Sequence, residues 1–233
     1  MKPRLSVVVP FFNEQDNVRP VLEELRQAVP GAEILAVDDG SSDRTWGQIR
    51  ALPFVSGIRL TTHLGQSAAL YAGIMAAQGE FCVLMDGDGQ NDPLDIPRLL
   101  AAREQGQGQV ICGYRAKRRD DLSRRLASRG ANFIRHLLID DDVRDTGCGL
   151  KLFPTAYRNL LVPFNGLHRF LPALFKQAGL KVAEIPVNHR PRTNGQSKYS
   201  NWERALRGAW DLVGVRWLLK RKLVLPPVET THE

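Results

Sequence analysis

The stretch Leu5-Ser6-Val7-Val8-Val9, continued by Pro10-Phe11-Phe12-Asn13-Glu14, decides the fold of this chain. Its run of β-branched residues predicts a β-strand that is buried on both faces. Residues 14–29 follow with apolar side chains at helical spacing, which predicts a helix directly after the strand. A buried strand that leads into a helix predicts the first half of a βαβ unit.

The same alternation of strand and helix continues through the first half of the chain. Further strands are predicted at residues 33–37, 58–61, 81–85 and 109–113, and further helices at 43–52, 66–78 and 94–104. We therefore expect an α/β fold with a Rossmann-like, mainly parallel central sheet that is flanked by helices. After residue 114 the pattern loosens, and a long helix is predicted over residues 201–222.

Composition and charge narrow the classes of function. The chain has 233 residues, with 32 Lys and Arg against 25 Asp and Glu, a formal net charge of +7. This excess favours a polyanionic partner, which can be a nucleic acid, an anionic membrane surface or a phosphorylated substrate. Three cysteines without metal-type spacing predict reduced core thiols in a cytosolic protein. We expect neither a membrane-spanning helix nor a signal peptide, since no apolar run has the required length.

Two classes are disfavoured by the motifs that do not accompany these features. The positive charge comes without a nucleic-acid motif or an aromatic-interleaved stacking pattern, so we expect no nucleic-acid partner. The first strand leads into residues 10–14 rather than into Gly-x-Gly-x-x-Gly, which argues against an NAD-dependent dehydrogenase.

Acidic and amide residues gather at the predicted carboxyl ends of three strands, the edge where open α/β sheets bind ligands. These segments are residues 10–14, Asp38-Asp39-Gly40-Ser41-Ser42-Asp43 and Asp86-Gly87-Asp88-Gly89-Gln90. Singly, each can be a helix cap or a turn. Together, clustered carboxylates are tolerated mainly where a cation offsets their repulsion. Asp86, Asp88 and Gln90 offer hard oxygen ligands that suit Mg²⁺ or Mn²⁺ shared with substrate phosphates.

The three segments together resemble the family-2 glycosyltransferases of the GT-A fold, and in particular the dolichol-phosphate mannose synthase-like branch that glycosylates polyprenyl phosphates. The resemblance covers about residues 5 to 200, which we expect to form the catalytic domain (1–200), followed by an amphipathic helix and tail (201–233). It implies a metal at Asp86, Asp88 and Gln90 that bridges a diphosphate, and it implies that the nucleotide-sugar is bound by Pro10, Phe12, Glu14, Asp39, Asp86 and Asp145. For Asp145 a cap or turn role stays open.

Basic residues after Tyr114 match the family positions that hold the acceptor phosphate. By the resemblance, that phosphate is bound by Arg115, Arg124, Ser128, Arg192, Ser197 and Lys198, and Asp86, Asp88 and Arg115 are the catalytic residues. Guanidinium groups suit this role because they bind phosphate oxygens in bidentate fashion. The remaining arginines of the basic segment can equally form a solvated helix face.

The chemical class of the acceptor can be narrowed by a pair of residues that the chain lacks at residues 145–151. A sugar hydroxyl needs a general base, and family-2 enzymes of that kind usually carry a Glu-Asp pair where this chain has residues 145–151 without one. A phosphate monoester is already an anion at neutral pH. We therefore expect inverting transfer from a UDP- or GDP-sugar to dolichyl or undecaprenyl phosphate. The alternative is transfer to a saccharide hydroxyl in surface-polysaccharide assembly.

The predicted C-terminal helix is amphipathic, with an apolar stripe opposite Arg204, Arg207 and Asp211. The stripe consists of Trp202, Leu206, Ala209, Trp210, Val213 and Trp217. Tryptophans beside basic residues suit a lipid headgroup layer, so we expect peripheral attachment to an anionic membrane surface on the cytoplasmic face. Packing of the stripe on its own domain, or on a second subunit of a homo-oligomer, is the alternative.

Overall fold

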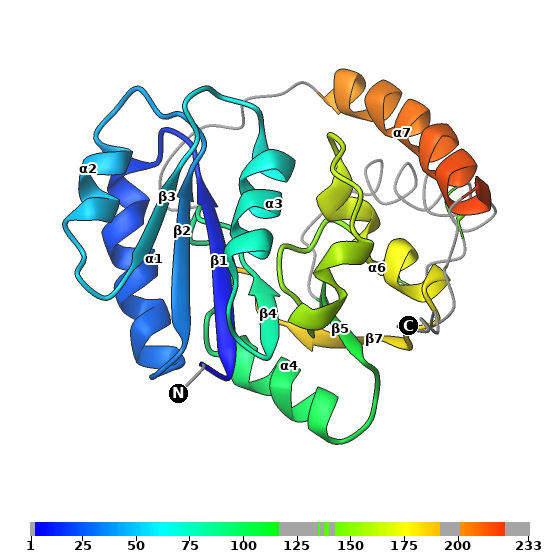
Figure 1. Cartoon of the computed structure of the whole chain (residues 1–233), viewed down its shortest axis with the longest axis horizontal. Coiled ribbons are helices and arrows are strands. Elements are labelled where there is room, and N and C mark those ends of the chain that lie inside the picture. Colours follow the sequence, from blue (N-terminus) through cyan, green and yellow to red (C-terminus); the bar gives the residue numbers. More distant parts are fainter. Residues whose placement is uncertain (1–2, 117–134, 136–137, 140–142, 192–200, 222–233) are drawn as a thin grey trace, which may run out of the picture.

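The computed structural model describes residues 3–116, 135, 138–139, 143–191 and 201–221, without the side chains of residues 201–207 and 209. The chain is organised around a central sheet with a helical layer on each side (Figure 1).

The seven strands of this sheet follow one another in the order β3 (Ser56–Arg59), β2 (Glu33–Asp38), β1 (Leu5–Phe11), β4 (Phe81–Leu84), β6 (Lys151–Pro154), β5 (Val110–Arg115) and β7 (Val182–Val187). Strand β6 runs antiparallel to both of its neighbours, and the other pairs are parallel. The predicted mainly parallel sheet is confirmed, and the strands predicted in the first half agree with it to within two residues.

Helices cover both faces of the sheet. One face carries α1 (Gln15–Ala28), α2 (Thr45–Arg50) and α4 (Asp95–Glu104), and the other carries α3 (Gln66–Ala76), η1 (Thr155–Leu160) and α6 (Leu167–Gln177). The alternation of side chains along β1 explains why both faces are covered. Val7 and Val9 pack with the first layer of helices, and Val8 packs with the second. The free cysteines Cys82, Cys112 and Cys148 are buried, as expected of core thiols.

The C-terminal helix α7 (Asn201–Arg221) lies outside α6 (Figure 1). Val215, only 3% exposed, packs with Phe170 and Ala173 of α6, and Arg216 Nη1 donates to the Leu138 carbonyl at 3.0 Å. Burying an aliphatic side chain of this size contributes roughly 1.5–3 kcal/mol. None of the helices in the described part of the chain is both long and apolar enough to span a bilayer.

The described side chains of the predicted apolar stripe face away from the domain. Trp210, Val213 and Trp217 are 77%, 57% and 64% exposed, so the alternative that they pack on their own domain is wrong. Asp211, predicted opposite this stripe, is half-buried, and its carboxylate lies against Gly166 just before α6. The side chains of Trp202, Leu206 and Ala209 lie outside the described residues.

Candidate active site

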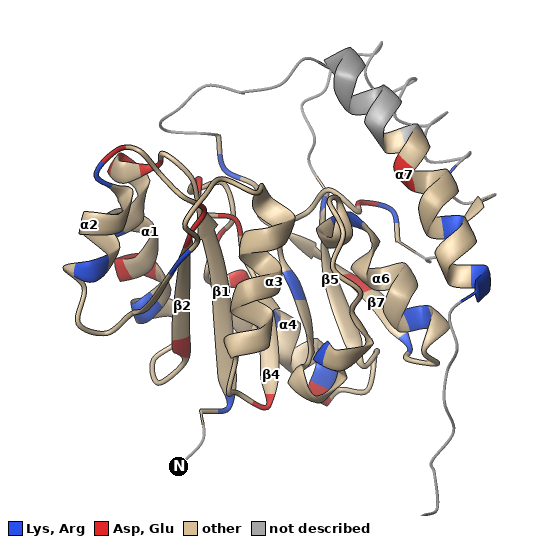
Figure 2. Cartoon of the chain, turned by 45° about the horizontal axis from the view of Figure 1, so that its top comes forward, with Lys and Arg blue, Asp and Glu red and all other residues tan. Residues whose placement is uncertain are grey.

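Strand ends from both halves of the sheet meet at one edge. Because β1, β2, β4 and β5 are parallel, the segments that follow them emerge at the same edge, where Figure 2 shows acidic segments gathered. The antiparallel β6 begins there, which places Lys151 beside Leu84 and Cys112. A cavity of about 330 Å³ opens at this edge and is lined among others by Gln66, Asp86, Arg115, Lys151, His168 and Arg169.

The loop after β1 is fixed to the loop after β2 by hydrogen bonds. Asn13 has a φ of 51°, a left-handed conformation that is rare outside glycine, and its Oδ1 accepts the N–H of Ser42 at 2.9 Å. Its own N–H donates to Ser41 Oγ, and the N–H of Glu14 donates to Thr45 Oγ1, both at 2.9 Å. These bonds set the position of Phe12 and Glu14, two of the predicted nucleotide-binding residues.

An aromatic stack stands beside this loop. The rings of Phe12 and His63 lie 3.7 Å apart at an angle of 15°, and His63 Nδ1 is 2.8 Å from Asp39 Oδ2. The buried Asp39 also accepts the N–H groups of Leu64 and Gly65 at 2.9 and 2.8 Å. Asp39, predicted near the base or ribose, thus fixes the loop that presents His63, and its contact with a nucleotide stays a prediction.

The Asp86-Gly87-Asp88 segment is held tightly against neighbouring backbone. A Cβ at Gly87 would lie 2.5 Å from the carbonyl oxygen of Pro10, and one at Gly149 would lie 2.3 Å from Asp86 Oδ2, so both positions need glycine. Gln66 Nε2 donates to Asp86 Oδ1 at 2.7 Å. Removal from water, followed by the charge of Asp88, raises the pKa of Asp86 to about 6.

The donor atoms around Asp86 fit a hard divalent cation. Asp88 Oδ1 accepts the N–H of Gln90 at 3.1 Å, and Gln90 Nε2 donates to the Arg190 carbonyl at 3.4 Å, which leaves Gln90 Oε1 as the amide atom for a cation. Within the described ranges, no group of three or more His, Cys, Asp and Glu residues could hold a metal. Two carboxylates and one amide oxygen therefore suit Mg²⁺ or Mn²⁺ only if the ion is shared with a ligand such as a diphosphate.

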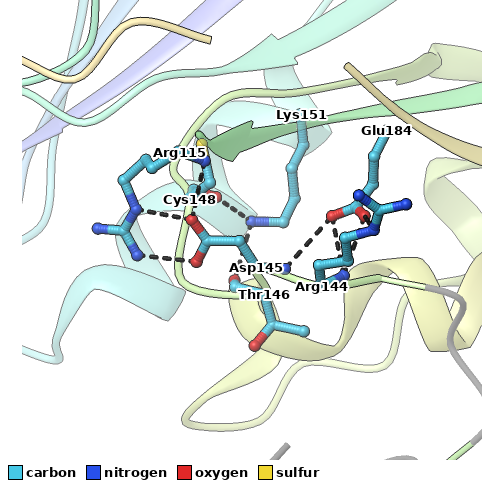
Figure 3. A network of polar contacts seen from close by, with 7 residues as sticks. All are labelled: Arg115, Arg144, Asp145, Thr146, Cys148, Lys151 and Glu184. Carbon is cyan, nitrogen blue, oxygen red and sulfur yellow. Dashed lines mark hydrogen bonds and ion pairs between the residues drawn. The ribbon is translucent and has the colours of Figure 1, made fainter. Parts of the chain in front are cut away.

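Arg115 lines the same cavity as Asp86. Its side chain is bound by Asp145 (Figure 3). Its Nε and Nη2 donate to the two oxygens of Asp145 at 2.7 and 2.8 Å, and its main-chain N–H donates to the same carboxylate at 3.2 Å. Burial alone would lower the pKa of Arg115, but the bonds to Asp145 outweigh it and raise that pKa. The charged guanidinium is thus oriented, and none of the described residues bonds its Nη1, which can bind a ligand oxygen.

Lys151 is a site residue that the sequence patterns did not identify. It is 3% exposed, and its Nζ donates to the carbonyl oxygens of Thr146, at 3.3 Å, and Cys148 (Figure 3). On the other side of the same loop, Glu184 accepts the main-chain N–H groups of Arg144 and Asp145. The loop that carries Asp145 is therefore fixed from two sides.

Most of the predicted acceptor-phosphate residues lie outside the described residues: Arg124, Ser128, Arg192, Ser197 and Lys198. The chain just before Arg192 is bound to the segment that carries Gln90. Arg190 Nη2 lies 2.8 Å from both Glu24 and Asp92, and its N–H donates to the Gln90 carbonyl at 2.9 Å. Residues 188–191 are thereby fixed beside Gln90.

The chain is similar to proteins of known activity. A family model described as glycosyl transferase family 2 matches residues 6–158. Dodecaprenyl-phosphate galacturonate synthase of Rhizobium johnstonii is 34% identical over 94% of this chain and 68% of its own length. Undecaprenyl-phosphate 4-deoxy-4-formamido-L-arabinose transferase of Edwardsiella ictaluri is 34% identical over 84% of this chain, which spans less than two thirds, 62%, of that relative.

Solved structures with the same fold include glucosyl-3-phosphoglycerate synthase of Mycobacterium tuberculosis. The complex with uridine diphosphate has a TM-score of 0.70 at 21% identity and covers 92% of this chain and 80% of its own. The complex with Mn²⁺, UDP-glucose and phosphoglyceric acid has a TM-score of 0.68 at 18% identity, with the same coverage. The expected GT-A fold is confirmed, and because the family model matches well over half of the sequence, the chain belongs to glycosyl transferase family 2.

Proposed function

We propose that the chain transfers a sugar from a UDP- or GDP-sugar to a polyprenyl phosphate, dolichyl or undecaprenyl, with inversion at the anomeric carbon. The observation that carries this proposal is the cavity between Asp86 and Arg115. Asp86 is the one acidic side chain among the described residues that line it, and Asp145 is bound to Arg115. With Asp86 assigned to the metal and Asp145 bound to Arg115, the described lining has no further carboxylate to deprotonate a hydroxyl, whereas a phosphate acceptor needs only positioning.

The donor end of the proposed site runs from the Phe12–His63 stack to Asp86. The base and ribose would lie near Pro10, Phe12, Glu14 and Asp39, and Asp86, Asp88 and Gln90 would hold a Mg²⁺ or Mn²⁺ ion against the diphosphate. When bound, that ion would neutralise negative charge on the departing diphosphate. The Mn²⁺ and UDP-glucose in the mycobacterial neighbour support a divalent ion for this fold.

The acceptor end would be formed around Arg115. A phosphate oxygen of the lipid, already anionic at neutral pH, would attack the anomeric carbon opposite the leaving diphosphate. Arg115 Nη1 would bind that phosphate together with Arg124, Ser128, Arg192, Ser197 and Lys198. Both relatives are named for polyprenyl-phosphate acceptors, which supports the same acceptor class here.

The exposed face of α7 would place the enzyme on the membrane that holds its acceptor. Trp210, Val213 and Trp217 form a solvent-exposed apolar face, and Lys220 and Arg221 stand in its last turn. Tryptophan beside basic residues suits an anionic headgroup layer, and we assign it to the cytoplasmic face, whose leaflet carries anionic lipids. Sedimentation with anionic vesicles tests this, and the Trp210→Ser/Trp217→Ser variant should stay in the supernatant. Equal binding by both proteins would contradict it.

The proposed reaction is tested by identifying a donor and then its product. Thermal shift with UDP- and GDP-sugars and Mn²⁺ should single out one donor, because ligand binding to the native state raises apparent stability. That donor should give a sugar-1-phosphopolyprenol with inverted configuration, and Arg115→Ala should raise KM for the lipid phosphate more than it weakens donor binding. Retained configuration, or an equal loss for both substrates, would overturn the proposal.

A further inference from the structure

A histidine that the proposed chemistry does not use lines the same cavity. His168 lies in the first turn of α6, after Gly166, whose φ of 99° begins the helix. The ring is half-buried and faces the cavity that also holds Asp86 and Arg115. Its Nδ1 lies 2.8 Å from Oγ of Ser67, a buried residue in the first turn of α3.

The bonds of Ser67 decide which ring nitrogen carries the proton. Ser67 Oγ accepts the N–H of Gly166 at 2.9 Å, and the Nδ1 of His168 is its second partner. A hydroxyl has one proton, and if Nδ1 also donated to Oγ, that buried proton would find no acceptor among the described residues. Ser67 therefore donates to Nδ1, so the proton of the imidazole resides on Nε2.

The surroundings of the ring keep it neutral. Loss of water, followed by the positive charges of Lys151 and Arg169, lowers the pKa of His168 to about 3. Both cations line the same cavity. Throughout the neutral range His168 thus presents one N–H at Nε2, and no hydrogen bond to that atom is found in the part of the chain that the structure describes.

The position of this N–H defines what it can bind, if the proposed function holds. The anomeric carbon must lie between the diphosphate at Asp86 and the acceptor phosphate at Arg115, so the transferred sugar occupies the space that the His168 ring borders. A neutral imidazole with a protonated Nε2 can only donate there. We propose that His168 Nε2–H donates a hydrogen bond to an oxygen of the transferred sugar, with Ser67 as the positioning residue that fixes the ring tautomer, so that the pair selects the donor sugar.

Two variants separate this role from a structural one. In His168→Gln the side-chain amide can place an N–H near the former Nε2, whereas in His168→Asn the shorter amide can bond Ser67 but presents no donor to the cavity. The measurement is the affinity for the nucleotide-sugar divided by the affinity for the matching nucleoside diphosphate, by calorimetry with Mn²⁺. This ratio isolates the sugar, and the diphosphate serves as the folding control for each variant.

We expect His168→Asn to lower this affinity ratio about tenfold, the usual worth of one neutral hydrogen bond, and His168→Gln to restore most of it. A donor analogue lacking the contacted oxygen should bind wild type and His168→Asn equally. A wild-type ratio in His168→Asn with a lowered ratio in His168→Gln would overturn the proposal. An unchanged ratio in both variants would overturn it as well. Because no transfer is measured, failure of the polyprenyl-phosphate reaction would leave this test intact.

Discussion

The two sides of the proposed site differ in the groups that fix them. On the nucleotide side, a carboxylate is bound by main-chain N–H groups, as Asp39 is by Leu64 and Gly65. On the side of β5 and β6, cations are bound by carboxylate and carbonyl oxygens, as Arg115 is by Asp145 and Lys151 by Thr146 and Cys148. On the first side, the bonds fix the conformation of a loop. On the second side, they hold the positively charged groups of Arg115 and Lys151 close together. Under the proposed function, the first side would recognise the nucleotide by its shape and the second would attract anions by its charge.

The largest expected effect comes from a substitution in the proposed metal site, between the two sides. Asp88→Ala removes a carboxylate that would offset the metal charge, so transfer should fall on the order of 10³-fold, and Mn²⁺-dependent donor binding should be lost. Transfer rates and calorimetry with Mn²⁺ measure both. Glu23→Gln, at an exposed ion pair on α1, is the matched control and should change neither. An active Asp88→Ala enzyme would remove the metal assignment.

The side of β5 and β6 is tested by removing one partner of the Arg115–Asp145 ion pair. Arg115 and Asp145 side chains are 16% and 11% exposed, so Asp145→Ala should cost about 2–3 kcal/mol of unfolding free energy by leaving Arg115 unpaired. Urea denaturation of both single variants and of the double variant measures the coupling. The double variant should cost clearly less than the sum of the two, and simple additivity would show that the pair is not coupled.

A smaller effect concerns the pH dependence of stability through His168. Its pKa is about 3 in the folded chain against an ordinary 6.5, because the site is confined and lies near Lys151 and Arg169. Below pH 6.5 the unfolded chain takes up a proton that the folded chain does not, so stability falls as the pH falls. Between about pH 7 and pH 5.5 wild type should lose about 1 kcal/mol more than His168→Gln. Parallel urea titrations measure this difference, and identical losses would contradict it.

The smallest expected effect lies on α7, where one side is packed and the other is exposed. Trp217→Ser should change the unfolding free energy by less than about 0.5 kcal/mol, since the side chain is 64% exposed. Val215→Ala, on the buried side, should cost about 1–2 kcal/mol. Thermal unfolding of the two variants compares them, and a larger cost for Trp217→Ser would mean that the tryptophan packs on protein.

The nucleotide side could be predicted from the sequence, and the opposite wall could not. Strand β1 is buried on both faces, so its run of β-branched residues predicts a strand. Asp86 and Asp88 are two residues apart, so their pairing can be seen in the sequence itself. Strand β6 has four residues that begin with a lysine and end with a proline, which hides it from periodicity. The role of His168 depends on Ser67, 101 residues away in sequence. In α6, the spacing of Phe170, Leu171 and Leu174 is the signal that could have revealed that helix.

The central claim is that the cavity serves a phosphate acceptor that needs no base. The most direct measurement compares kcat/KM for undecaprenyl phosphate with that for undecaprenol, using the donor that the thermal-shift screen selects and Mn²⁺. The proposed site predicts transfer to the phosphate and no measurable transfer to the alcohol, because Asp86, the one carboxylate among the described cavity residues, is assigned to the metal. Transfer to the alcohol, or to a saccharide hydroxyl, at a comparable rate would contradict the claim.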